Sequence, residues 1–333
     1  MMKKVRLIVA LLMAVTLLSF AVSAVAKDES GITIGFSQYT LGAPYFKAQV
    51  EAAKAKAEEL GVKLVAIDAQ DDMVKQLGDV EDLLSQGIDV LILNPKDPKG
   101  LVPATKKATA AGVPVIIIDS SIDPSADFVT TVQSNNDENG EKVGEWLVQE
   151  MSRLMPGQRI KMALISGAKG NPVGKARRNG VFKGILEEQL RSKGQAGFDI
   201  LAQGWGNWQH EGGLEAMEDI LVAHPDVNVL LAENDSMALG AMRAIENAGL
   251  TPMKDIIICA AADGQKEALQ LIKEGKYGAT GMNSPVLTAH MAVEIAVEIA
   301  KGEEKEYPKV TYTPAICITK ENVDQYYDPN AIF

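Results

Sequence analysis

The sequence has few of the residues that build disulfide scaffolds and metal sites. Among 333 residues there are only two cysteines, Cys259 and Cys317, so a fold held together by several disulfides is excluded. Whether these two pair stays open, because a sequence does not give the distance between them. The three histidines, His210, His224 and His290, do not have the spacing of a metal site. We therefore expect neither a metal nor a cofactor.

Positive charge is also scarce. The chain carries 33 Lys and Arg against 44 Asp and Glu, a formal net charge of −11, and no basic block. Such a chain repels nucleic acids and anionic membrane surfaces, so we expect neither as a partner. Apolar runs long enough to cross a bilayer are missing after residue 26.

The N-terminal segment has the three parts of a secretory signal peptide. Lys3, Lys4 and Arg6 precede the apolar run 7–22, and an Ala-x-Ala end follows at residues 24–26. A retained membrane anchor is the alternative, but the apolar run is shorter than the roughly 20 residues that a spanning helix needs. We expect cleavage after residue 26 and a mature protein in the periplasm.

Residues 27–333 alternate between short β-branched apolar runs and longer segments of helical period, and they are too many for one usual core. The expected strands are 32–37, 62–67, 90–93, 113–119, 128–132, 161–166, 200–203, 227–232, 256–261 and 278–282, with two more near Thr311 and Ile316. The expected helices include 45–60, 73–86, 212–223 and 287–301. Apolar strands without polar alternation are typical of parallel sheets covered on both faces. The pattern predicts an α/β protein with two doubly wound parallel-sheet domains.

A helix and two strands remain after two complete halves, which indicates that the chain crosses back to its first half. Crossings near Ser134, Ser284 and Thr313 would form a three-strand hinge. The expected organisation is a signal peptide at 1–26, an N-terminal lobe at 27–134 plus 285–312, and a C-terminal lobe at 135–284 plus 313–333.

Polar and tryptophan residues stand where the expected strands end. Ligands of open α/β sheets bind outside the carboxyl ends of the strands, so these residues are candidates for one site. They are Ser37, Asn94, Asp119, Ser134, Trp205, Trp208, Asn234, Asp263 and Asn283. Each of the polar ones alone is also an ordinary turn residue. Together, amide and carboxylate groups that bind hydroxyls and indole faces that cover C–H surfaces suit a neutral polyhydroxylated small molecule.

Several segments in order resemble one family. They are LILNPKDP at 91–98, VPVIIIDSSID at 113–123, ARRNGVF at 176–182, AHPDVNVLLAENDSMALGAMRA at 223–244 and AADGQ at 261–265. The chain resembles the periplasmic sugar-binding proteins of ABC importers, in the ribose-binding-protein branch. The resemblance implies two lobes joined by three crossing strands, a sugar in the interdomain cleft, hinge closure on the sugar, and delivery to ABC permease subunits at the membrane. It also implies a monomer.

The resemblance assigns roles to individual residues. Tyr45 and Phe46 match an aromatic pair that covers one sugar face, and Trp208 matches an aromatic position on the second lobe. The matching polar positions are Asn94, Asp119, Arg177, Asn234, Asp263 and Asn283. Taken without the resemblance, Arg177 is a solvated residue near a helix start. Trp205 and Trp208 have the core as an alternative, but two tryptophans among glycines at a strand end more often line a cleft.

The chain departs from the ribose pattern at several of these positions. Ser120, which is also a candidate ligand residue, stands where ribose binders carry a second arginine. Ala262 stands where a phenylalanine is usual, and Asn283 where they have glutamine. Ala43 replaces an asparagine, and the loop 38–42 is two residues longer. Losing an arginine removes a planar multidentate donor. The substitutions argue against ribose and favour another sugar, a furanose or a polyol.

Three functions remain open at this point. The first is a solute receptor for an importer, and the second is a sugar receptor for a chemoreceptor or sensor kinase. The third is an enzyme such as a glycosidase, with Asp119 and Asp263 as the carboxyl pair that this chemistry needs. His210 and Glu211 also look like an acid–base pair, but we expect them to begin a helix, where acids are favoured. A lactose-repressor-type regulator shares the fold but needs a helix-turn-helix in front, where this chain has the expected signal peptide. We expect a binding protein and not an enzyme.

Overall fold

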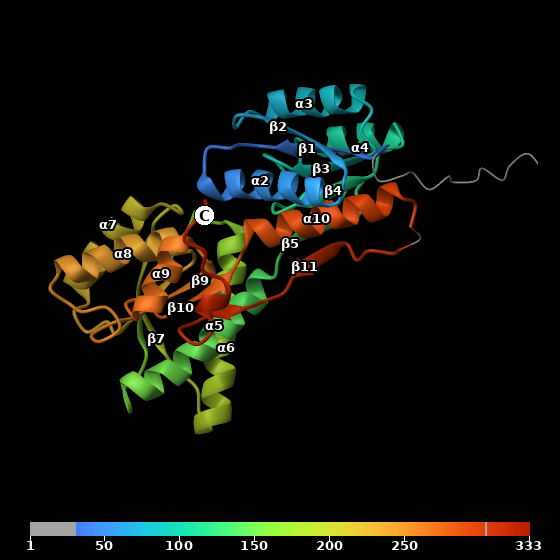
Figure 1. The fold of residues 1–333 in the computed structure, drawn as a ribbon. Helices are drawn as coiled ribbons and strands as arrows, with labels where there is room; N and C mark the ends of the chain where they lie inside the picture. The colour runs from blue at the N-terminus through green and yellow to red at the C-terminus, as the bar shows by residue number, and fades with distance from the viewer. Residues whose placement is uncertain (1–30, 304) are drawn as a thin grey trace, which may run out of the picture.

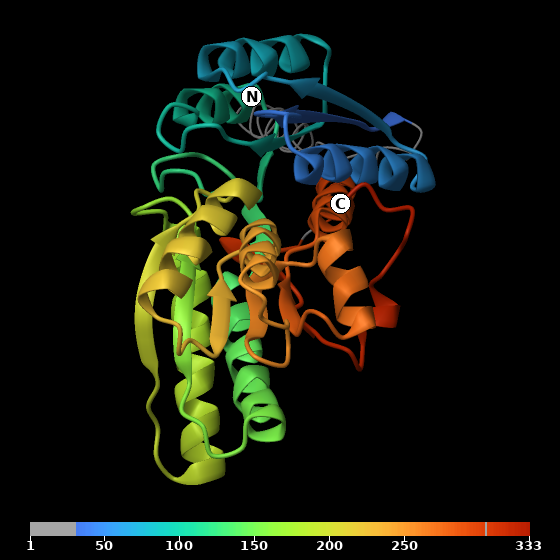
Figure 2. The same cartoon turned by 90° about the vertical axis from the view of Figure 1, so that its left-hand side faces the viewer.

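The computed structural model describes residues 31–303 and 305–333, and it places them in two lobes that each contain a six-stranded sheet (Figures 1 and 2). In the first sheet the order is β11-β5-β4-β3-β1-β2, and in the second it is β12-β10-β9-β8-β6-β7. The strands of the first lobe are β1 (Thr33–Gln38), β2 (Lys63–Asp68), β3 (Val90–Asn94), β4 (Val115–Ile118), β5 (Thr130–Ser134) and β11 (Val310–Thr313). Those of the second lobe are β6 (Lys161–Ser166), β7 (Asp199–Trp205), β8 (Val229–Ala232), β9 (Ile257–Asp263), β10 (Ala279–Met282) and β12 (Cys317–Ile318).

Helices cover both faces of each sheet. In the first lobe they are α2 (Pro44–Glu59), α3 (Met73–Ser85), α4 (Val102–Ala110) and α10 (Pro285–Ala300). In the second lobe they are α5 (Asn136–Leu154), α6 (Pro172–Lys193), α7 (His210–Ala223), α8 (Asp235–Asn247) and α9 (Lys266–Glu274). Two apolar clusters lie on the two faces of each sheet. The predicted pair of doubly wound sheets is confirmed, with β12 as an antiparallel edge strand.

The chain passes between the lobes at three points. It leaves the first sheet after β5, returns from the second sheet after β10, and crosses again between β11 and β12. The start of α10 therefore stands directly at a crossing (Figure 1). Strand β5 ends at Ser134 and β10 ends at Met282. The first two crossings therefore lie at the carboxyl edges of the two sheets.

The strand and helix limits differ from the expected ones by a few residues at most places. The strand expected at 128–132 is β5 and begins two residues later, since its pairing with β4 aligns Ile116 with Thr130. Residues 210 and 211 begin α7, as expected. The expected signal peptide at 1–26 lies outside the described residues. Within the part of the chain that is described, no helix is long and apolar enough to cross a membrane.

Glycines let α5 and α6 pack with their backbones in contact. An added Cβ at Gly180 would lie 2.0 Å from the main-chain oxygen of Asp137, and one at Gly140 would lie 2.3 Å from that of Arg177. The same close approach recurs one turn further on, at Gly144 and Gly184. This packing fixes the first turn of α5 against the segment of α6 that carries Arg177.

The two cysteines do not form a disulfide. Cys259 lies buried in β9 and Cys317 is partly buried in β12, and both are free thiols. Strand β10 lies between them, with Ala279 opposite Cys259 and Gly281 opposite Cys317. Two strand spacings are roughly 9–10 Å, beyond the reach of a disulfide. Burial raises the pKa of Cys259 to about 12, as expected for an inert thiol.

Candidate functional site

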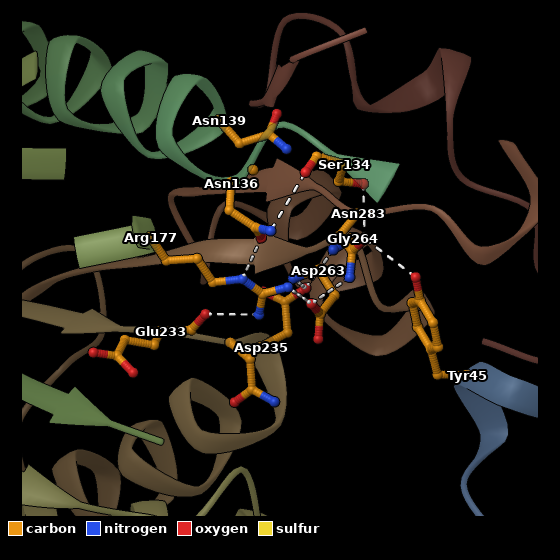
Figure 3. A network of polar contacts seen from close by, with 12 residues as sticks. Tyr45, Ser134, Asn136, Asn139, Arg177, Glu233, Asp235, Asp263, Gly264 and Asn283 are labelled. Carbon is orange, nitrogen blue, oxygen red and sulfur yellow. Dashed lines mark hydrogen bonds and ion pairs between the residues drawn. The ribbon is translucent and has the colours of Figure 1, made fainter. Parts of the chain in front are cut away.

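Residues from both lobes and from the crossing segments meet in one polar network (Figure 3). Tyr45, in the first turn of α2, donates its hydroxyl proton towards Asp119 Oδ1 at 2.9 Å and Asn283 Oδ1 at 3.1 Å. Asn283 follows β10 and donates from Nδ2 to Asp263 Oδ1 at 3.2 Å. The carboxyl ends of the two sheets are thus connected through one side chain at a crossing.

Arg177 joins three separate groups of this network. It projects from α6 and is only 5% exposed. Its Nε donates to Asn136 Oδ1 at 2.8 Å, its Nη1 to the main-chain oxygen of Glu233 at 3.1 Å, and its Nη2 pairs with Asp263 Oδ1 at 2.9 Å. Figure 3 shows the guanidinium directed at Asp263. Protein groups therefore already fix the orientation of the planar guanidinium group.

Asp235 holds the loop that carries Asp263. Its Oδ2 accepts the backbone N–H groups of Asp263, Gly264 and Gln265 at 3.1, 2.7 and 2.8 Å, and its Oδ1 accepts the hydroxyl of Tyr277 at 2.8 Å. Burial, and then the charge of Asp263, raise the pKa of Asp235. Four donors on one buried carboxyl group leave the loop little freedom, so Asp263 is presented at a fixed position.

Glu233 is a second buried acid beside the site. It is 1% exposed, its Oε2 accepts the backbone N–H of Gly167 at 2.8 Å, and its Oε1 pairs with Arg178 Nη1 at 2.7 Å. A Cβ on Gly174 would lie 2.1 Å from Oε2, so any other residue there would displace the carboxylate. The buried charge is paired and hydrogen-bonded, as such groups need to be.

On the first lobe, Asp119 follows β4 with a left-handed backbone, φ 63°, which is unusual for a residue other than glycine. Burial raises its pKa, although Tyr45 and Arg177 act in the opposite direction. Burial and the Asp119 charge also raise the pKa of Tyr45 well above its usual value, so the phenol keeps its proton. A phenol has a single proton, and it can serve only one of the two acceptors at a time.

Asn94, the last residue of β3, is fully buried, and neither its Oδ1 nor its Nδ2 makes a hydrogen bond of normal geometry among the described residues, although the amide lies close enough to Asp119 to act against the rise of that carboxyl's pKa. The polar groups next to this amide do have hydrogen-bond partners. The Ser37 hydroxyl accepts from Gln76 Nε2 at 3.3 Å, and Gln76 also donates to the main-chain oxygen of Asn94 at 2.8 Å. An unsatisfied buried amide costs about 1–3 kcal/mol, so this side chain indicates a polar ligand.

The crossing segments add further polar groups. Ser134 donates its hydroxyl to Asn283 Oδ1 at 2.7 Å. Asn139 of α5 donates to the main-chain oxygen of Met282 at 2.7 Å and accepts the N–H of Ile316 at 2.9 Å. One asparagine side chain therefore connects two of the three crossings.

The aromatic candidates fall into two groups. Phe46 lies between Tyr39 and Tyr45, with ring centroids 4.8 and 5.4 Å away in edge-to-face geometry. The Trp208 ring lies against Gly167, with the Arg177 guanidinium carbon 5.8 Å from its centroid. Trp205 stands at the end of the edge strand β7 and is 38% exposed.

Two other candidates make hydrogen bonds within the protein. Asn234 caps α8, because its Oδ1 accepts the N–H of Met237 at 3.1 Å and its Nδ2 donates to the Trp208 oxygen at 3.4 Å. Ser120 is partly buried and donates its backbone N–H to the oxygen of Ile118. These contacts do not test whether either residue binds the ligand, so both ligand roles stay predictions.

Sequence reasoning missed Asn136, Asn139, Glu233 and Asp235. Asn136 stands two residues beyond Ser134, and Glu233 and Asp235 flank Asn234, so the strand-end rule that found their neighbours could have included them. Their roles depend on contacts over long sequence distances, which no local pattern reveals.

The arrangement presents oriented donors and acceptors rather than a nucleophile with a base. Asp119 is hydrogen-bonded to Tyr45, and Asp263 is paired with Arg177. Among the described residues, no group of three or more His, Cys, Asp or Glu side chains is placed to hold a metal ion. Such a constellation is suited to holding hydroxyl groups.

Comparisons with known proteins point the same way. Residues 34–304 match the model of the family described as "Periplasmic binding protein domain". The chain is 35% identical over 279 residues to the Ribose import binding protein RbsB of Bacillus subtilis, covering 83% of this chain and 84% of that protein. Two solved structures have the same fold. One is an ABC transporter periplasmic solute binding protein from Actinobacillus succinogenes with bound D-allose, at 28% identity and a TM-score of 0.76, covering 89% of this chain and all of that one.

The other is an ABC transporter solute binding protein from Bacillus halodurans with bound myo-inositol, at 28% identity and a TM-score of 0.72, covering 90% of this chain and 98% of that one. Such import proteins are periplasmic, which implies an extracytoplasmic place for this one. The chain belongs to the periplasmic binding protein family, in its ribose-binding-protein-like branch of ABC-importer solute-binding proteins.

Proposed function

We propose that this protein captures one neutral sugar or cyclic polyol between its lobes and delivers it to the permease subunits of an ABC importer. The observation that carries the proposal is Asn94, whose buried amide has a donor and an acceptor without protein partners. An amide of this kind matches two adjacent hydroxyl groups, one accepting and one donating.

The charges around the site favour a neutral ligand. Arg177 is paired with Asp263, and Glu233 is paired with Arg178, so each cation is matched by an acid. Asp119 adds a further carboxylate, which accepts a hydrogen bond from the uncharged phenol of Tyr45. An anionic ligand would meet uncompensated negative charge, whereas hydroxyl groups donate to carboxylates.

The ligand class also follows from the relatives. Proteins similar to this one are named or titled for ribose, D-allose and myo-inositol, which are all uncharged and rich in hydroxyls. Ser120 and Ala262 are smaller than the residues expected of a ribose binder, and both lie at the ends of core strands. More room at these positions favours a hexose, a furanose form of one, or a cyclitol over ribose.

Capture by closure is part of the proposal. The lobes are 27–134 plus 285–312 and 135–284 plus 313–333, and the crossings near Ser134, Ser284 and Thr313 serve as the hinge. The protein acts as a monomer outside the cytoplasm after removal of residues 1–26. It performs no catalysis, with Asp119 and Asp263 acting as hydrogen-bond acceptors.

A thermal-shift screen with D-ribose, D-allose, D-galactose, L-arabinose and myo-inositol tests the ligand class. A ligand at 100 times its dissociation constant stabilises the folded state by about 2.7 kcal/mol. We expect a clear rise of the unfolding midpoint with at least one of these compounds and none with anionic sugar phosphates. If no neutral compound raises the midpoint, the proposed ligand class is wrong.

The substitution Asn94→Leu tests the site. It removes the amide while keeping a side chain of similar size, so the free protein should stay folded, whereas the midpoint rise with the best compound should shrink by an amount that corresponds to at least ten-fold weaker binding. Asn247→Leu, at an exposed position near the end of α8, is the matched control and should bind like the parent. Equal binding by both variants would show that the ligand does not contact Asn94.

A further inference from the structure

Residues 326–333, here called the C-terminal strap, run from the second lobe to the first. Tyr326 and Tyr327 pack against the core of the second lobe. The Lys266 ammonium group of α9 then donates to the Ala331 carbonyl oxygen at 2.7 Å. A turn at Asp328 orders the segment, because its Oδ1 accepts the N–H of Asn330 at 2.8 Å. The strap is therefore anchored on the second lobe.

The far end of the strap contacts the first lobe. The Phe333 ring meets the Tyr45 ring edge to face, with centroids 5.2 Å apart and planes at 87°. In both views the end marked C lies beside α2 (Figures 1 and 2). Phe333 thereby extends the row of Tyr45, Phe46 and Tyr39 to four rings, three of which belong to the first lobe.

The strap also closes one side of the space between the lobes. It lines a cavity of about 750 Å³ together with α2, the start of α10 and the loop after β9. Asp263, which pairs with Arg177, lies in the wall of this cavity, and so does Phe333. The cavity therefore adjoins the proposed ligand site, and the strap separates part of it from solvent.

We propose that Phe333 is a positioning residue for Tyr45, and that the C-terminal strap favours the arrangement in which the lobes are together. Tyr45 has one proton for two acceptors, Asp119 and Asn283, so its hydrogen bonds alone do not fix its ring. Phe46 restrains the ring from within the first lobe, and the edge-to-face contact with Phe333 adds a restraint from the second lobe. Because Phe333 is anchored on one lobe and Tyr45 belongs to the other, the contact is lost when the lobes separate.

The inference deepens the proposed function, on which its meaning for ligand capture rests, but its test uses no ligand. Dyes are placed at Val74→Cys on α3 and Glu218→Cys on α7, both exposed, in a Cys317→Ser background. Single-molecule energy transfer then measures the ratio of lobes together to lobes apart in the ligand-free protein. We expect Phe333→Ala to lower this ratio about five-fold, the size of one aromatic pair.

Further variants separate the aromatic contact from general packing. Phe333→Tyr should keep the parent ratio, whereas Phe333→Leu, which retains bulk but not the ring, should fall between the parent and Phe333→Ala. Lys266→Met, which removes the bond to Ala331, should also lower the ratio. Ile332→Ala, at a side chain that is 55% exposed, is the matched control and should leave it unchanged. An unchanged ratio in Phe333→Ala, or an equal loss in Ile332→Ala, would overturn the proposal whatever the ligand screen finds.

Discussion

The second lobe holds its part of the site in place by contacts within the lobe, whereas the first lobe leaves its part incomplete. In the second lobe Arg177, Asp263 and Asp235 are fixed by ion pairs and backbone N–H groups. In the first lobe Asn94 has two unpaired polar atoms, and Asp119 is a buried acid on a left-handed backbone. A preorganised surface loses little entropy when it binds, and unpaired groups supply the differential interaction that draws the lobes onto a ligand.

The helices also pack more closely in the second lobe than in the first. In the second lobe α5 and α6 touch through glycines, so closely that a side chain at these positions would clash with the facing backbone. In the first lobe α2 and α10 pack through small side chains, including Ala53, Ala289 and Ala292. The closer contact is found next to the more rigid part of the site.

The strongest test of this comparison is Arg177→Ala. It leaves Asp263, whose side chain is only 14% exposed, without its cation. The free energy of unfolding should therefore fall by about 3–5 kcal/mol, and sugar binding should be lost. Denaturant titration measures the stability. Arg159→Ala, which breaks the exposed pair with Asp199, is the control and should cost less than about 1 kcal/mol. Similar losses in both variants would mean that the Arg177 network does not organise the second lobe.

Gly180→Ala tests the helix contact. Its Cβ would lie 2.0 Å from the Asp137 oxygen, so α5 and α6 must move apart at a cost of about 1–3 kcal/mol. Gly78→Ala is the first-lobe control, because nothing lies within 4 Å of its Cβ in α3, and it should stabilise the protein by up to about 1 kcal/mol. Opposite signs in denaturant unfolding would support the comparison, and equal signs would contradict it.

Asp119→Asn tests how much the buried carboxylate of Asp119 lowers the stability of the folded protein. Burial raises the pKa of Asp119 in the folded protein above its value in the unfolded chain, so its charge costs stability above the folded pKa. The variant should be more stable than the parent by about 0.5–2 kcal/mol at pH 7, while it binds sugar less tightly. The gain should fade as the pH falls through the folded pKa, and it should vanish below about 3.9, the unfolded value. A variant less stable than the parent at pH 7 would show that the carboxylate is stabilised by its partners.

The smallest effect is expected from reduction. Both cysteines lie in the second lobe as free thiols, so a reducing agent should leave the unfolding midpoint unchanged. Thiol titration in denaturant without reductant should find two thiols per chain. A midpoint that falls on reduction would mean that the rigidity of the second lobe depends on a covalent bond.

Much of the fold was predictable because the signals are local. Unbroken apolar strands such as β3 and β4 indicate sheets covered on both faces, and helices of apolar period lie between them. The strand-end rule then placed Asn94 and Asp119 at the carboxyl edge of the first sheet and Asp263 at that of the second, since parallel strands end together. Asn234 also stands at a strand end and caps α8, and its expected ligand role stays a prediction.

The sequence by itself determined the α/β class, the two lobes and the polar character of the strand ends, since each depends on periodicity or on the residue types at the ends of elements. Only the tertiary structure decided that Arg177 is shared by Asn136, Glu233 and Asp263, that the cysteines stay apart, and that Phe333 reaches Tyr45. Phe333 and Tyr45 are far apart along the chain. Their contact depends on how the lobes sit together, and a local pattern does not carry that information because it arises from the summed packing of both lobes.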